Sequence, residues 1–71
     1  MVNDKINFSM NLTALMAIER IAKEENKNTE DILISFMKSN TGQMVYDDST
    51  KFWWDGPAAV AQEYKKEMGI V

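Results

Sequence analysis

The chain contains no cysteine and no histidine among its 71 residues, and this absence strongly limits how it can fold. A domain this short buries only about 60% of the surface that its unfolded chain exposes. Small domains often compensate with disulfide bonds or a Cys/His zinc site, and neither can form here. Stability must therefore come from large apolar side chains or from association between chains.

The composition is that of a single globular domain spanning residues 1–71. Apolar residues make up 45% of the chain and charged residues 27%, and the formal charge is -3. Two Trp, two Tyr, three Phe and six Met are many large apolar side chains for this length, so we expect a homodimer. Because we find no signal-peptide pattern and no apolar run of about 18 residues, we expect a cytoplasmic protein that does not contact membranes.

No set of residues indicates an enzyme. Without His or Cys, the chain has no imidazole base and no thiol nucleophile. Ser35 and Lys38 match a Ser-x-x-Lys pattern, but the accompanying motifs of acyl-enzyme hydrolases are absent. Asp47, Asp48 and Asp55 lack the spacing of an EF-hand loop and suit turns and helix caps instead. We predict no catalytic residue, no bound metal and no cofactor.

Residues 5–12 alternate between polar and apolar side chains. The apolar positions are Ile6, Phe8, Met10 and Leu12. A period of two is typical of a half-buried strand, so the pattern predicts an N-terminal strand or extended segment. Asn11 can also cap the helix that follows, and both interpretations hold together if the strand comes first.

Two helices are predicted next, over about residues 12–25 and 30–39. Apolar side chains recur at helical spacing in the first at Leu15, Ile18, Ile21 and Ala22, and in the second at Ile32, Leu33, Phe36 and Met37. Asn28 or Thr29 can cap the second helix, and Gly42 can end it in a left-handed conformation. These features predict a helical hairpin.

Residues 43–46 and 51–54 are short runs typical of strands. Four turn-forming residues, Asp47 to Thr50, join them and predict a β-hairpin. Pro57 then marks the start of a C-terminal helix, with Val60, Tyr64 and Met68 on one face and Gly69 as its stop. The predicted fold class is α+β: an N-terminal strand, a helical hairpin, a β-hairpin and a C-terminal helix.

Trp53 and Trp54 are adjacent, so in a strand their side chains point to opposite faces. One can fill the core, and the other is either covered by a helix or exposed as an anchor at a protein interface, where Trp is enriched. Together with Tyr46 and Tyr64, they are the predicted protein-binding residues of the aromatic hairpin and the C-terminal helix.

A polar strand face, Lys5, Asn7 and Ser9, followed by two helices of which the second opens at Thr29, resembles the ribbon-helix-helix family of dimeric DNA-binding repressors. The resemblance covers residues 4–40. It implies that the strand face contacts bases and that the amino end of the second helix holds a phosphate. DNA binding is therefore an alternative function.

The motifs Ser39-Asn40-Thr41-Gly42, Tyr46-Asp47-Asp48 and Lys51 to Pro57 resemble a pattern in small uncharacterised bacterial proteins of Firmicutes and their mobile elements, some lying beside predicted toxin genes. This resemblance implies a role in a toxin-antitoxin or phage-conflict module. We therefore expect a non-enzymatic, antitoxin-like regulatory or inhibitory protein that binds a partner protein. A further alternative is an acidic phage-type inhibitor of a nucleic-acid-processing enzyme, in which clustered carboxylates imitate phosphates.

Overall fold

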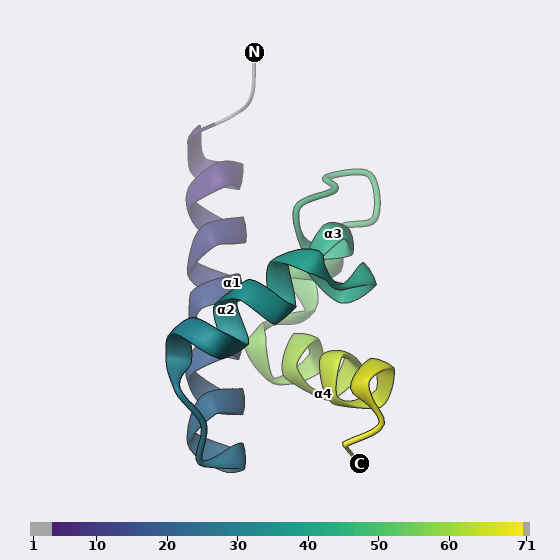
Figure 1. Ribbon diagram of the computed structural model, residues 1–71. Coiled ribbons are helices and arrows are strands. Elements are labelled where there is room, and N and C mark those ends of the chain that lie inside the picture. The colour runs from purple at the N-terminus through teal and green to yellow at the C-terminus, as the bar shows by residue number, and fades with distance from the viewer. Residues whose placement is uncertain (1–3, 71) are drawn as a thin grey trace.

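The computed structural model describes residues 4–70, and all of their regular elements are helical. The α-helices are α1 (Asp4–Glu25), α2 (Thr29–Lys38), α3 (Asn40–Val45) and α4 (Pro57–Met68), and a 3₁₀ helix, η1, spans Phe52–Asp55. No strand occurs within residues 4–70. The predicted α+β class is therefore wrong, and the chain forms a small all-α domain (Figure 1).

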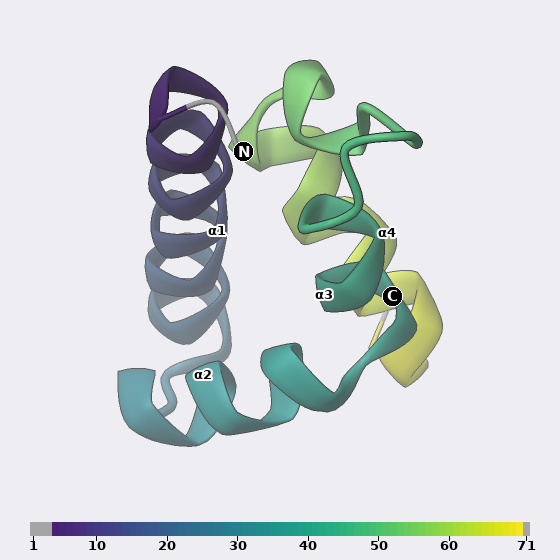
Figure 2. The ribbon, with the colours of Figure 1, turned by 90° about the horizontal axis from the view of Figure 1, so that it is seen from above.

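The long helix α1 forms one side of the molecule. Seen from above, the helices α2, α3 and α4 lie around one side of α1, and no other described element covers its opposite side (Figure 2). The core lies on the covered side. Its most deeply buried side chains come from all four α-helices: Ile18, Ile21, Phe36, Thr41, Val45 and Val60.

The predicted N-terminal strand is helical because two helical stripes interleave in this segment. Met10 is buried and Ile6 packs against the core, whereas Phe8 and Leu12 are exposed. Residues four apart share one face of a helix, so each pair forms its own stripe, on opposite sides of α1. Both stripes occupy even-numbered positions, so together they give the alternation of apolar and polar residues that is typical of a strand.

The helical hairpin is present, but its inner faces differ from the predicted ones. Ile32 and Phe36 of α2 are buried, whereas Leu33 and Met37 are 43% and 50% exposed. In α1, Leu15 is likewise 50% exposed, although it was predicted to face the core. Helical spacing alone admits a wide apolar stripe, and the neighbouring helices decide which part of it is covered.

The predicted strand over residues 43–46 is wrong, because residues 43–45 belong to α3 and Tyr46 is the residue that caps its C-terminal end. Ser39 starts this helix, because its Oγ accepts a hydrogen bond from the Gly42 amide at 2.9 Å and donates one to the Phe36 carbonyl at 2.6 Å. Gly42 lies inside α3 and does not end α2 in a left-handed conformation. A glycine is required there because a Cβ atom would lie 2.0 Å from the Phe36 carbonyl oxygen.

Glu67 of α4 caps the first turn of α3 by hydrogen bonding. Its carboxylate accepts hydrogen bonds from the Asn40 amide at 2.8 Å, the Thr41 amide at 2.8 Å and the Thr41 hydroxyl at 2.7 Å. These bonds, led by the one from the Thr41 hydroxyl, lower the pKa of Glu67 below its ordinary value of 4.5. A side chain distant in sequence thereby satisfies amides that a helix leaves unpaired at its start.

The predicted β-hairpin is also wrong, although its turn is present. Asp47 Oδ1 accepts hydrogen bonds from the Ser49 amide and hydroxyl at 3.0 and 2.6 Å. These bonds lower the pKa of Asp47. Lys51 then takes a left-handed conformation with φ 51° and leads into η1. The chain therefore passes from one short helix to another.

The boundaries predicted for the C-terminal helix are confirmed. Pro57 occupies its first turn, and Gly69 ends it with φ 71°. Val60 and Tyr64 are buried, whereas Met68 is 41% exposed.

Candidate functional site

The four aromatic residues predicted to bind a partner lie in different environments. Trp53 and Tyr64 are core side chains, 9% and 2% exposed, whereas Tyr46 and Trp54 are 38% and 75% exposed. The Tyr46 hydroxyl donates a hydrogen bond to Asn11 Oδ1 at 2.9 Å, and partial burial raises its pKa above the ordinary value of 10.0. Of the four rings, Trp54 is the most accessible to a partner.

The buried ring of Trp53 contacts the exposed ring of Trp54. The two rings meet edge to face, with centroids 5.5 Å apart and planes at 74°. The Trp53 carbonyl accepts a hydrogen bond from the Thr13 hydroxyl at 3.4 Å, which connects η1 to α1. Trp53 Nε1 is buried without a hydrogen-bond partner in the described part of the chain, so apolar packing holds this ring. Trp54 thus lies beside α1 and packs against a buried ring.

A shallow groove of about 370 Å³ runs between Trp54 and α1. Its lining residues are Ser9, Leu12, Thr13, Trp53, Trp54 and Gly56. Aromatic and aliphatic walls with a few hydroxyl groups are typical of sites that accept an apolar side chain.

The side of α1 that faces away from the core is also apolar, and we call it the outer face of α1. It consists of Phe8, Leu12, Leu15 and Met16, which are 67%, 44%, 50% and 47% exposed. Because Leu12 also lines the groove beside Trp54, these four residues and Trp54 form one apolar surface.

The outer face of α1 was not predicted from the sequence, because Phe8 and Leu12 were assigned to a strand and Leu15 to the core. Helical spacing of residues 8, 12, 15 and 16 was the signal that could have found it.

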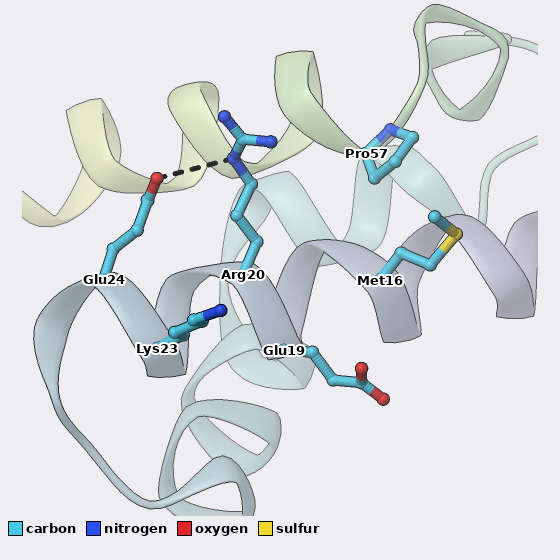
Figure 3. A pocket seen from close by; sticks show the side chains of 6 residues that line it. All are labelled: Met16, Glu19, Arg20, Lys23, Glu24 and Pro57. Atoms are coloured by element: carbon cyan, nitrogen blue, oxygen red, sulfur yellow. Dashed lines mark ion pairs between the residues drawn. The ribbon is translucent and has the colours of Figure 1, made fainter.

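Charged side chains border this apolar surface at the C-terminal half of α1. A wide, open hollow of about 600 Å³ is lined by Met16, Glu19, Arg20, Lys23, Glu24 and Pro57 (Figure 3). Arg20 Nε lies 3.5 Å from Glu24 Oε2, and Lys65 of α4 also pairs with Glu24. The hydrogen bond from Lys65 is the main cause of the lowered pKa of Glu24. Exposed ion pairs of this kind contribute little to stability, and here they form a polar rim.

The residues predicted to contact DNA do not form one surface. Lys5, Asn7 and Ser9 lie on the first turns of α1, where Lys5 and Ser9 share one side and Asn7 points about 160° away from both. Thr29 opens α2, but the Glu30 amide already donates to Asn28 Oδ1 at 2.7 Å. The strand on which the ribbon-helix-helix resemblance depends is absent, because this segment belongs to α1.

Ser35 and Asp47, two of the polar residues considered for possible chemistry, make structural contacts. The Ser35 hydroxyl accepts a hydrogen bond from the Tyr64 hydroxyl at 2.6 Å, which joins α2 to α4. Within residues 4–70, no group of three or more Asp, Glu, His or Cys side chains is arranged to hold a metal ion. Asp47 belongs to the turn after α3.

None of the helices formed by residues 4–70 combines the length and the hydrophobicity needed to cross a membrane. Comparisons of the chain with protein-family models, with curated proteins and with solved structures found no match.

Proposed function

We propose that this protein is a non-enzymatic, cytoplasmic regulator that acts by binding another protein through the outer face of α1 and Trp54. The observation that carries the proposal is the exposure of Trp54, at 75%, beside four further large apolar side chains on one surface. A Trp ring left in water gains about 25 cal/mol for each Å² that a partner covers. Trp is also among the residues that contribute most to protein interfaces.

An antitoxin-like role is the specific form of this proposal. The resemblance of motifs within residues 39–57 to small bacterial proteins, some of which are encoded beside predicted toxins, supports it. The net charge of -3 favours a basic partner, and nucleic-acid-acting proteins are commonly basic. In this role, the protein inhibits the partner by covering one of its surfaces.

The proposal is tested by photo-crosslinking in bacterial cells. A photoreactive amino acid replaces Trp54 in one variant and Glu63, on the exposed side of α4, in a control. We expect a covalent adduct with the same identified protein from position 54 and none from position 63. Equal adducts from both positions, or no adduct at position 54, would contradict the proposal.

Binding of the purified partner then measures the contribution of Trp54. Trp54→Ala should raise the dissociation constant about 30-fold or more, because interface hot spots are worth about 2 kcal/mol or more. Glu63→Ala should leave the dissociation constant unchanged. For an antitoxin-like role, Trp54→Ala should also lose inhibition of the partner during co-expression.

A further inference from the structure

Trp54 lines two hollows of different chemistry. The first is the groove beside α1, in which Leu12 and Trp53 are apolar walls. The second has a volume of about 380 Å³ and is lined by Thr50, Lys51, Trp54 and Asp55, and we call it the Asp55 hollow. Because Trp54 belongs to both, a chain segment that passes over this ring meets an apolar wall on one side and a carboxylate on the other.

Hydrogen bonds fix the backbone around the Asp55 hollow. The Thr50 hydroxyl donates to the Met44 carbonyl at 2.7 Å and accepts a hydrogen bond from the Phe52 amide at 3.2 Å. The Trp54 amide donates to the Lys51 carbonyl at 3.0 Å. An occupant therefore meets a preformed site, and preformed sites lose less conformational entropy on binding.

Negative charge is concentrated on this part of the chain. Residues 47–55 contain three aspartates and one lysine, so they carry two of the three net negative charges of the chain. Asp47 already accepts hydrogen bonds from Ser49. The exposed Asp55 carboxylate has neither an ion pair nor a side-chain hydrogen bond with another residue in the range 4–70. Its charge is available to a cation.

We propose that Trp54 and Asp55 bind an arginine side chain of the partner protein, next to an apolar side chain that occupies the groove beside α1. This inference rests on the proposed function, because it names the chemistry of the partner at the same surface. A planar guanidinium stacks on an aromatic face and donates hydrogen bonds to a carboxylate at the same time. Trp54, at 75% exposure, offers the face, and Asp55 lines the same hollow.

The charges favour this occupant over an acidic or a purely apolar one. Asp55 repels an acidic side chain, and a purely apolar segment would use the groove and leave the carboxylate without a partner. Lys51 also lines the Asp55 hollow, and its charge opposes a guanidinium. A long exposed lysine side chain can turn its ammonium group to water. Removal of Lys51 and removal of Asp55 should therefore change arginine binding in opposite directions.

Two blocked tetrapeptides are the probes for this site. One has leucine and arginine at its centre, and the other has citrulline, which has the shape of arginine without its charge, in place of the arginine. Binding is followed by the indole N–H signal of Trp54 in the ¹⁵N-labelled protein. The arginine peptide should bind with a dissociation constant about tenfold lower than that of the citrulline peptide. Equal binding, or no shift of the Trp54 signal at tens of millimolar arginine peptide, would overturn the proposal.

The role of the carboxylate is tested by Asp55→Asn, which keeps the size of the side chain and removes its charge. It should raise the dissociation constant of the arginine peptide about fivefold and leave that of the citrulline peptide unchanged. Asp48→Asn is the matched control, because Asp48 is exposed and lines neither hollow. Lys51→Ala should lower the dissociation constant about twofold. Equal losses in Asp55→Asn and Asp48→Asn would show general attraction by charge and contradict the assigned site.

The apolar part of the proposal is tested by replacing the leucine of the arginine peptide with serine. The serine peptide should bind about tenfold more weakly, because it loses the burial of an apolar side chain. It should no longer shift the amide signal of Leu12, which lines the groove. Equal affinity of the two peptides would show that the groove is not occupied.

A second copy of the chain is the alternative occupant. If it fills these hollows, the Trp54 signal should move with protein concentration in the absence of peptide, and this result would overturn the proposal. A signal that stays constant from micromolar to several hundred micromolar protein supports a foreign partner.

The two proposals fail separately. An adduct with a foreign protein at position 54, together with equal binding of the arginine and citrulline peptides, refutes the arginine site and retains the proposed function. Preference for the arginine peptide, together with no foreign adduct at position 54, retains the arginine site and refutes regulation of another protein.

Discussion

The amide and Cα of Gly42 lie against the last turn of α2. A Cβ atom at this position would lie 2.0 Å from the Phe36 carbonyl oxygen, a backbone atom that cannot rotate away. Gly42→Ala should therefore lower the free energy of unfolding by about 3 kcal/mol, measured by urea denaturation. Gln43→Ala, at the exposed next position of α3, should change it by less than about 0.5 kcal/mol. Similar losses in the two variants would contradict the steric explanation.

Replacing each of the two adjacent tryptophans should have different effects on stability. Trp53 is 9% exposed and Trp54 is 75% exposed. Trp53→Ala should therefore lower the free energy of unfolding by about 3–5 kcal/mol, because it removes a large core side chain. Trp54→Ala should lower it by less than about 1 kcal/mol. Thermal and urea unfolding of both variants check this order, and a greater loss in Trp54→Ala would show that its ring supports the fold.

At the scale of elements, Glu67 joins α4 to α3. Its pKa in the folded protein is lower than its ordinary value of 4.5 because of hydrogen bonds from Thr41 and Asn40. Its contribution to stability is therefore fully present above the unfolded pKa and is lost as the pH falls through the folded pKa. Glu67→Gln should lower the free energy of unfolding at pH 7 by about 1 kcal/mol, as the loss of a helix cap does.

The difference between wild type and Glu67→Gln should depend on pH in a defined way. It should be constant above about pH 6 and shrink as the pH falls below 4.5, the ordinary pKa of the carboxyl. Glu63→Gln, on the exposed side of α4, removes a carboxylate outside this contact and is the matched control. Urea denaturation at a series of pH values measures both, and a constant difference down to the folded pKa and below would contradict the linkage.

At the scale of the whole molecule, one small core joins all four α-helices. A domain of this size has a net stability of only about 3–5 kcal/mol. Phe36 is fully buried and packs on Tyr64 with ring centroids 5.6 Å apart. Phe36→Ala should cost about 3–5 kcal/mol, so the whole domain rather than α2 alone should unfold.

Far-ultraviolet circular dichroism tests this prediction. Phe36→Ala should lose most of its helical signal at 25 °C, whereas Met37→Ala, at a position that is 50% exposed, should keep it. A Phe36→Ala protein that loses only the signal of one short helix would show that the elements fold independently.

The sequence alone determined the features that depend on a few neighbouring residues. Pro57 begins α4 and Gly69 ends it, and the cap of α2 was narrowed to Asn28 or Thr29, of which the structure selects Asn28. Caps and stops can be predicted because they act on amides and carbonyls within one turn. The absence of Cys also excluded disulfide bonds before any fold was known.

The tertiary structure decided which apolar side chains are inside. Residues 5–12 fit both a strand and a helix with two apolar faces, and only the packing of other helices on one side of α1 selects the helix. Residues 43–45 belong to α3, and Glu67, more than 20 residues away in the chain, binds the first turn of this helix. Burial depends on where distant segments lie, and local spacing does not contain that information. The same packing leaves Phe8, Leu12 and Trp54 on the surface, where the proposed contacts form.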